Sequence, residues 1–157
     1  MKTIQLKLYK FDELSAEAQK KAVDDNSNLY IDTVWWSTVY EDAKDVGLEI
    51  DGFDLDRANY CNVKLKLPAL EVCKKLLEAS YLPTKIASAF QFKFEAETDD
   101  TPEDEQEELR MNFERALGNM YLQILRDEYE YITADGTIRS GLQINEYDFT
   151  EDGQMYS

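Results

Sequence analysis

Apolar and polar residues alternate with a period of two in three stretches of the chain, and this alternation predicts half-buried β-strands. The first stretch runs from Thr3 to Tyr9. The second runs from Leu48 to Asp56 and changes phase at Gly52, which indicates a β-bulge. The third, Cys61 to Leu67, is ended by Pro68 and should pair with the second as an antiparallel hairpin.

One segment, TKIASAFQFKFEAE, fits two patterns. Ile86, Phe90 and Phe94 would share one face of a helix, whereas Phe90, Phe92 and Phe94 alternate as they would in a strand. Three aromatic residues at a period of two suit a pleated surface better than a single helical stripe. We therefore expect a strand from Ala89 to Ala96.

Apolar residues three and four positions apart predict helices in most of the remaining chain. Gly47 is expected as a left-handed C-cap residue, and Asp152 with Gly153 as a hairpin turn. The predicted helices are FDELSAEAQKKAVDDN capped by Asp12 or Ser15, VWWSTVYEDAKDV after Asp32 or Thr33, Ala69 to Ser80, Pro102 to Tyr131, and a weak helix near Thr137 to Asn145.

The Pro102–Tyr131 helix is the longest predicted element. Thr101 is a suitable N-cap, Pro102 fits the first helical position, and the acidic residues that follow face the positive end of the helix dipole. A helix of about 30 residues, about 45 Å long, should either brace the fold or take part in a homodimer. The prediction is a single α+β domain over residues 1–157, a small antiparallel sheet packed on helices with one long helix in its C-terminal half.

The net charge of the chain limits the kinds of partner that the protein can bind. The chain of 157 residues has 33 Asp and Glu against 17 Lys and Arg, a formal net charge of −16. Such a molecule repels phosphates, so we expect no direct nucleic-acid binding and a basic protein as partner. The N-terminus MKTIQLKLYKF has no signal-peptide pattern, and no apolar run reaches about 20 residues, so the predicted location is cytoplasmic, with no membrane contact.

The residues that usually carry catalysis are missing. The chain has no histidine, which removes Ser–His and Cys–His pairs and histidine-bound zinc, and it has no glycine-rich phosphate loop. Cys61 and Cys73 lack metal-type spacing and are expected to be buried thiols. A cluster of three aspartates could bind Mg²⁺ or Ca²⁺ through carboxylate oxygens: Asp51, Asp54 and Asp56. The alternation of a strand already explains why aspartates there would face the solvent. We expect no enzyme activity, no catalytic residue, no metal and no cofactor.

The segment EAETDDTPEDEQEE is the candidate contact surface. It could be a solvated loop and helix start, because the helix dipole favours carboxylates there. It could also mimic a nucleic-acid backbone, since carboxylates three or four residues apart on a helix lie about 5–6 Å from one another, on the scale of successive phosphates. The predicted partner-binding carboxylates are Glu95, Glu97, Asp99, Asp100, Glu103, Asp104, Glu105, Glu107 and Glu108.

Three motifs together carry a resemblance: YKFDELSAEAQKKA, then WWSTVYEDAKDVGLEIDGFDLDR followed by YC, and LRDEYEYIT with NEYDFTEDG. They resemble a group of small acidic proteins encoded by bacteriophages and related mobile elements, loosely described as antitoxin-like. The motifs lie toward both ends of the chain and leave residues 67–98 uncovered. The resemblance implies a phage or prophage setting and supplies no catalytic residue.

The expected function combines this setting with the charge. It is a phage-encoded, non-enzymatic inhibitor of a host defence system that handles nucleic acid, of the anti-CRISPR or anti-restriction type. An acidic surface would occupy the basic groove of the Cas or restriction machinery in the host bacterial cytoplasm. The alternatives are an antitoxin-like or regulatory module that neutralises one basic protein, and an enzyme working with carboxylates alone.

Crowding of like charges gives a first prediction. The melting temperature should rise when NaCl increases from about 10 to about 200 mM, because screening weakens repulsion between carboxylates over a Debye length of about 8–10 Å. Differential scanning fluorimetry measures this directly. A melting temperature that stays flat or falls over this range would show that the carboxylates are not densely clustered.

Overall fold

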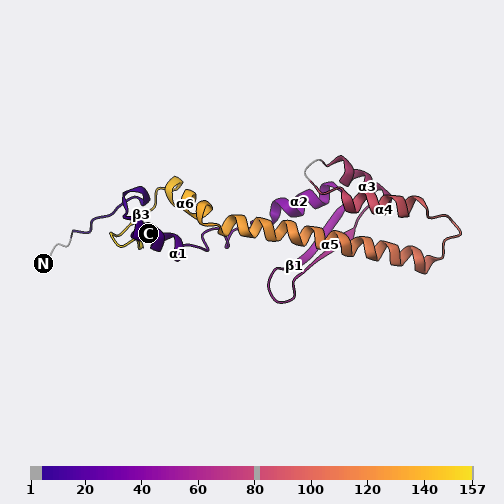
Figure 1. Ribbon diagram of the computed structural model, residues 1–157, viewed down its shortest axis with the longest axis horizontal. Helices are drawn as coiled ribbons and strands as arrows, with labels where there is room; N and C mark the ends of the chain where they lie inside the picture. The colour runs from indigo at the N-terminus through magenta and orange to yellow at the C-terminus, as the bar shows by residue number, and fades with distance from the viewer. Residues whose placement is uncertain (1–4, 80–81, 157) are drawn as a thin grey trace. The chain divides into compact units, whose positions relative to one another are not determined.

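The computed structural model describes residues 5–79 and 82–156 and confirms an α+β fold (Figure 1). No helix in these two ranges combines the length and the apolar character needed to cross a bilayer. The elements in chain order are the 3-10 helix η1 (Phe11–Glu13), α1 (Ala16–Asp25), α2 (Ser37–Asp45), β1 (Leu48–Asp54), β2 (Tyr60–Leu65), α3 (Ala69–Glu78), α4 (Lys85–Glu95), α5 (Glu103–Thr133), α6 (Asp135–Ile144), β3 (Asp148–Phe149) and β4 (Met155–Tyr156).

The chain divides into two compact units. Unit 1 takes residues from Met1–Trp35 and Glu128–Ser157, and unit 2 is Trp36–Asp127. Helix α5, which has 31 residues and matches the long predicted helix, contributes to both. The single domain expected from chain length stays a prediction, as does the homodimer.

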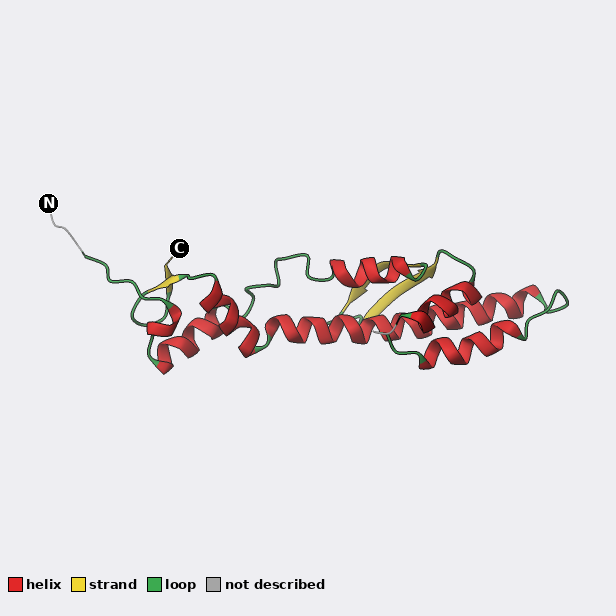
Figure 2. Cartoon of the chain, turned by 90° about the horizontal axis from the view of Figure 1, so that it is seen from above, coloured by secondary structure: helices red, strands yellow, loops and turns green. Residues whose placement is uncertain are grey.

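The sheet of unit 2 is the predicted hairpin. Strands β1 and β2 pair antiparallel, and the register shifts between Ile50 and Gly52, where the bulge was expected. Gly47 has φ +84° after the end of α2, which confirms its role as the left-handed residue that turns the chain into β1. Figure 2 shows α2 and α5 on either side of the two strands.

Helix α5 meets the outer edge of β2 at Gly118. A Cβ added there would overlap the backbone carbonyl oxygen of Cys61, so only glycine lets the helix backbone come this close. One turn earlier, the Glu114 carboxylate accepts a hydrogen bond from the Leu65 N–H at 3.0 Å. The helix therefore borders β2 where a third strand would otherwise lie.

The strand expected from Ala89 to Ala96 is wrong, because these residues belong to α4 and the start of the following loop. Phe90 and Phe94 both pack on Phe113 of α5, and their ring centroids lie 5.0 and 5.2 Å from the ring centroid of Phe113. Phe92 is 77% exposed. Phe90 and Phe94 are four positions apart and lie on one face of a helix, and Phe113 of α5 packs against that face. No strand in the described ranges lies beside this segment to pair with it, so the helix forms instead of the strand.

Two further predictions are corrected at the N-terminal side. The expected strand Thr3–Tyr9 is not formed over its described part: Gln5–Leu8 has no strand structure, and Tyr9 makes only an isolated bridge to Phe149. Thr3 and Ile4 lie outside the described residues. Helix α2 begins at Ser37 instead of near Val34, and Trp35 and Trp36, which precede it, are half-buried.

Unit 1 joins the two ends of the chain. Ser15 caps α1, its hydroxyl accepting from the Ala18 N–H at 3.2 Å as predicted, and Gly153 at φ +90° turns the predicted β3–β4 hairpin. Tyr9 and Phe149 exchange backbone hydrogen bonds of 2.9 and 2.8 Å. The core of this unit consists of Phe11, Leu14, Ala18, Ala22, Val23, Ile138, Leu142 and Phe149.

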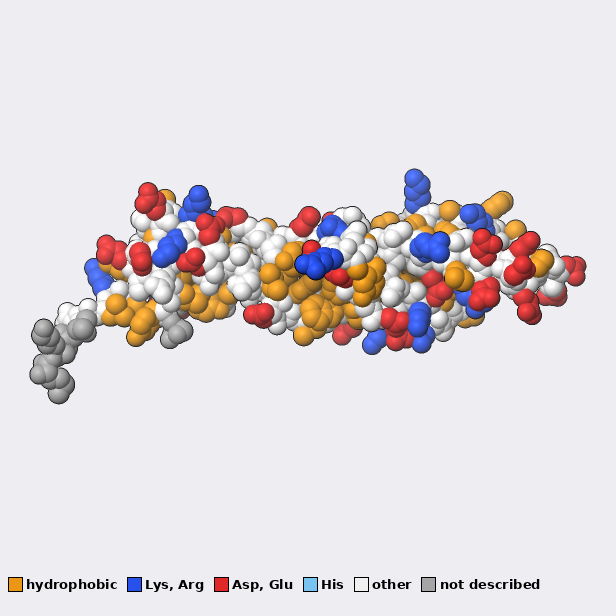
Figure 3. Space-filling view, turned by 90° about the horizontal axis from the view of Figure 1, so that it is seen from below, with side chains coloured by type: hydrophobic (Ala, Val, Ile, Leu, Met, Phe, Trp, Pro, Cys, Tyr) orange, Lys and Arg blue, Asp and Glu red, His pale blue; other side chains and the backbone are white. Residues whose placement is uncertain are grey.

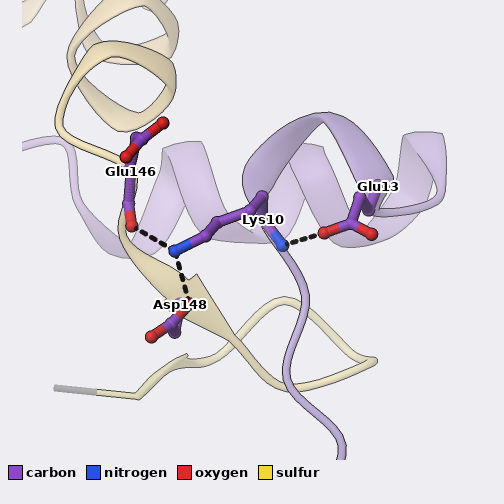
Figure 4. A network of polar contacts seen from close by, with 4 residues as sticks. All are labelled: Lys10, Glu13, Glu146 and Asp148. Carbon is purple, nitrogen blue, oxygen red and sulfur yellow. Dashed lines mark hydrogen bonds and ion pairs between the residues drawn. The ribbon is translucent and has the colours of Figure 1, made fainter.

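A polar network covers this junction (Figure 4). The Lys10 ammonium donates to the Asp148 carboxylate at 2.8 Å and to the Glu146 carbonyl at 2.9 Å, while the Lys10 N–H donates to Glu13 at 2.7 Å. Asp148 raises the pKa of Lys10 above its ordinary value through this hydrogen bond. Both side chains of the ion pair are about half exposed, so it orders the surface more than it stabilises the unit.

The close approach at Gly118 gives the second prediction. Gly118→Ala should lower the free energy of unfolding by about 1–3 kcal/mol, because the added methyl group pushes α5 away from β2. Helix propensity alone predicts the opposite, a gain of about 1 kcal/mol. Urea unfolding followed by circular dichroism distinguishes the two.

The control is Gly52→Ala in the same unit. A Cβ at Gly52 has no atom within 4 Å, and its φ lies outside the left-handed region, so this substitution should change stability little. Equal stability of Gly118→Ala and the unaltered protein would show that α5 does not press on the Cys61 carbonyl.

Candidate acidic interface

The nine predicted carboxylates gather at one end of unit 2. They lie on the last residue of α4, on the loop of residues 96–102 and on the first turns of α5, and we call this set the acidic tip. Figure 3 shows Asp and Glu side chains concentrated at this end, on the right of the view. The members of the acidic tip are Glu95, Glu97, Asp99, Asp100, Glu103, Asp104, Glu105, Glu107 and Glu108.

Hydrogen bonds within the loop hold the acidic tip in place. The Thr101 hydroxyl accepts from the Thr98 N–H at 2.9 Å, and the Gln106 amide donates to the Thr101 carbonyl at 2.7 Å. The Thr101 hydroxyl therefore closes the loop and does not cap α5 as expected. The Pro102 carbonyl instead accepts the first helical hydrogen bonds, from Glu105 and Gln106.

The carboxylates of the acidic tip are exposed and lack cationic partners. Eight of the nine residues are exposed and Glu97 is half-buried. None forms an ion pair with any residue in the described ranges. Glu95 accepts a hydrogen bond from the Gln91 amide at 3.2 Å, while the buried Oε2 of Glu97 has no hydrogen-bond partner.

Carboxylates line one face of α5 over its first two turns. Asp104, Glu107 and Glu108 border a shallow hollow of about 290 Å³ that continues to Met111 and Arg115. These positions are three or four residues apart, so they form the ridge that the sequence predicted. Arg110 and Arg115 follow on the next turns, which limits the purely acidic surface to the start of the helix.

Asp51, in the bulge, and Asp54, at the end of β1, make local contacts. The Asp51 carboxylate pairs with the Lys64 ammonium at 3.0 Å, and Asp54 accepts hydrogen bonds from the N–H groups of Asp56 and Ala58 at 2.8 and 3.2 Å. Across residues 5–79 and 82–156, no three acidic or thiol side chains are grouped as metal ligands.

A second feature, which the sequence did not predict, is a groove of about 1320 Å³ between β2 and α5. Its walls come from the strand and the residues after it, from α5 between Glu107 and Asn119, and from Phe94 and Glu97 at one end. The lone Gly118 inside the long helix was the only signal in the sequence that a backbone would come close there.

Of the two thiols expected to be buried, Cys73 is buried and Cys61 is only half-buried. Burial raises the pKa of Cys61 and that of Cys73 from 9.0 to about 11. The nearby Glu95 carboxylate contributes to the rise at Cys73, which places α3 within the field of the acidic tip. Neither thiol has the low pKa of a nucleophile at neutral pH.

Comparison of the chain with protein-family models, with curated proteins and with solved structures gives no match.

The raised thiol pKa values give the third prediction. At pH 8 a thiol with a pKa of about 11 holds about a hundredfold less thiolate than one at 9.0, so iodoacetamide should alkylate the native protein far more slowly than the unfolded chain. Peptide mass spectrometry reports each cysteine separately.

The same groups make stability depend on alkaline pH. Because folding raises both pKa values, the unfolded chain loses these protons first, and the contribution to stability is complete below pH 9.0 and is lost as pH rises toward about 11. Rapid alkylation of native Cys73 at pH 8 would contradict this interpretation.

Proposed function

We propose that the protein is a non-enzymatic inhibitor whose acidic tip occupies the basic nucleic-acid-binding groove of a partner protein. The observation that carries the proposal is the concentration of nine carboxylates, none with a cationic partner among the described residues, at one end of unit 2. An anionic surface without internal cations is free to pair with lysine and arginine side chains of a partner.

The hairpin of α4 and α5 supports this use of the charge. The carboxylates stand on helix ends and on a loop closed by its own hydrogen bonds, and Phe90, Phe94 and Phe113 pack directly beneath them. Preorganised charges lose little conformational entropy on binding, which favours competition with a stiff nucleic acid. Carboxylates three or four positions apart along α5 are spaced on the scale of successive phosphates.

The phage setting implied by the motifs directs the choice of partner. Defence enzymes of the host, of the CRISPR or restriction type, carry basic grooves that bind DNA or RNA, and they act in the bacterial cytoplasm. We place the proposed inhibitor there. An antitoxin-like module that neutralises one basic protein would use the same surface, and the two roles differ in whether the partner's nucleic acid is displaced.

The fourth prediction tests the acidic tip by charge reversal. Added protein should displace a fluorescent oligonucleotide from a Cas or restriction complex, and displacement should weaken as NaCl rises. Replacing Glu103, Asp104, Glu107 and Glu108 by Lys should abolish displacement, a loss of about a hundredfold or more in inhibitory potency, because attraction becomes repulsion. Fluorescence anisotropy gives the potency.

A matched variant controls for net charge. Glu17, Asp24, Asp25 and Asp32 are exposed carboxylates of unit 1, and replacing these by Lys changes the charge of the molecule equally. This control should retain most of the inhibition. Inhibition that survives reversal of the acidic tip would exclude this surface as the competitor, and rescue of growth against a co-expressed toxin without displacement would favour the antitoxin-like role.

A further inference from the structure

The outer face of helix α4 carries a phenylalanine that the fold leaves in water. Phe90 and Phe94 define the inner face of this helix, because both pack on Phe113 of α5. Side chains follow one another at about 100° per residue, so Phe92 points directly away from that face. It is the most exposed large apolar side chain among the described residues of unit 2. Unit 2 therefore gains little from an aromatic ring here, and the ring loses its water only against another molecule.

The residues around Phe92 on this face are small near the middle of α4 and charged at its two ends. Lys85 begins the helix and Glu95 ends it, while Ser88 lies one turn before Phe92, and all of them are exposed. No ion pair between described residues includes Lys85 or Glu95. Glu95 accepts a hydrogen bond from the Gln91 amide on its own helix. Both end charges are thus available to another molecule.

This arrangement is complementary to itself. When two α4 helices lie antiparallel with position 90 of one beside position 90 of the other, Lys85 of each copy lies opposite Glu95 of the other. Phe92 of each copy then lies opposite Ser88 of the other, and the small side chain leaves room for the ring. A two-fold interface between identical chains requires such reciprocal pairs, in which each residue meets the partner of its own counterpart.

The charges on this face select the occupant and its direction. A uniformly basic partner would be repelled by Lys85 and a uniformly acidic one by Glu95, whereas an antiparallel second copy pairs both. The other cation of the helix, Lys93, lies to the side, with its ammonium 5.1 Å from the centroid of the Phe90 ring. Parallel helices would instead place like charges opposite each other and bring the two acidic tips together.

The antiparallel direction also separates the acidic tips of the two copies. Each acidic tip follows the C-terminal end of its own α4, so the tips lie at opposite ends of the paired helices. Lys85 and Glu95 are ten positions apart, which places the two ends about 15 Å apart along the axis. This exceeds the Debye length of about 8 Å at physiological salt, so screening weakens the repulsion between the tips.

We propose that two copies of the chain form an antiparallel dimer through the outer faces of their α4 helices, with Phe92 of each packed on Ser88 of the other and Lys85 of each paired with Glu95 of the other. The inference does not depend on the proposed function, and Glu95 is the one member of the acidic tip that it uses. A helix of 11 residues offers a small interface, so the dimer should be weak, with a dissociation constant of about 10–100 µM.

The fifth prediction concerns association of the full chain between about 1 and 200 µM, measured by analytical ultracentrifugation at physiological salt. The unaltered protein should be monomeric at the lowest concentration and mainly dimeric at the highest. Phe92→Glu should stay monomeric throughout, because it places a carboxylate at the centre of the interface, and its melting temperature at low concentration should be unchanged because this side chain is exposed. Met111→Glu makes the same change at an exposed apolar residue outside α4 and should dimerise normally.

An exchange of charges tests the antiparallel register. Lys85→Glu and Glu95→Lys should each weaken dimerisation about tenfold, because each places like charges opposite each other. The double variant should return to within about threefold of the unaltered protein, because opposite charges face each other again. If net charge alone governed association, Glu95→Lys would strengthen it. Circular dichroism of each variant at low concentration confirms that the fold is retained.

Several outcomes would overturn the dimer. They are an unaltered protein that stays monomeric up to about 200 µM, a dimer that persists in Phe92→Glu, and a dimer that Glu95→Lys strengthens. A double variant as weak as the single variants would show that Lys85 and Glu95 do not face each other. These measurements contain neither nucleic acid nor a partner protein, so their outcome is separate from that of the displacement assay.

Discussion

The contact between α5 and the outer edge of β2 is the constraint on which unit 2 depends. Gly118 brings the helix backbone against the Cys61 carbonyl, and one turn earlier Glu114 accepts from Leu65. Phe113, the neighbour of Glu114, packs on the aromatic rings of α4. Less than two turns of helix therefore join the hairpin of strands to the hairpin of helices, and both the acidic tip and the groove take their positions from this segment.

The start of helix α5 explains only some of the carboxylates of the acidic tip. Glu103, Asp104 and Glu105 occupy the first turn of α5, where the helix dipole favours carboxylates. Glu107 and Glu108 lie beyond this turn, and Glu95 ends α4, where the dipole has the opposite sign and disfavours negative charge. Capping thus accounts for three carboxylates. Among the rest, Glu95 accepts a hydrogen bond from Gln91, but no ion pair within the described residues offsets the repulsion among them. This excess is the physical reason to regard the surface as a contact site.

The sequence predicted the elements whose partners are close along the chain. The β1–β2 hairpin with its bulge, the Ser15 cap and the long helix all follow from local spacing and turn chemistry. Predictions failed where a distant partner decides. Phe90 and Phe94 are helical because Phe113 receives them, and Tyr9 makes only a bridge because its partner is the short strand at Phe149. No local pattern encodes either choice.

The acidic tip was located from composition alone, but the groove needed three-dimensional information. Carboxylates in one segment of the chain remain together in any compact fold. The acidic tip therefore forms whether residues 89–96 are a strand, as expected, or part of the helix α4. The groove depends on how the part of α5 before Gly118 lies beside β2, which a single glycine in a helical pattern does not reveal.

The proposed pairing of the acidic tip with a basic groove would be long-ranged, would speed encounter and would be screened by salt. Glu97 and Glu107 belong to the acidic tip and also line the groove between β2 and α5. The charge of the tip therefore extends to the groove, where Arg110 and Arg115 oppose it. The arginines would limit the acidic surface that a basic partner can use to the end of unit 2 formed by the loop and the first turns of α5.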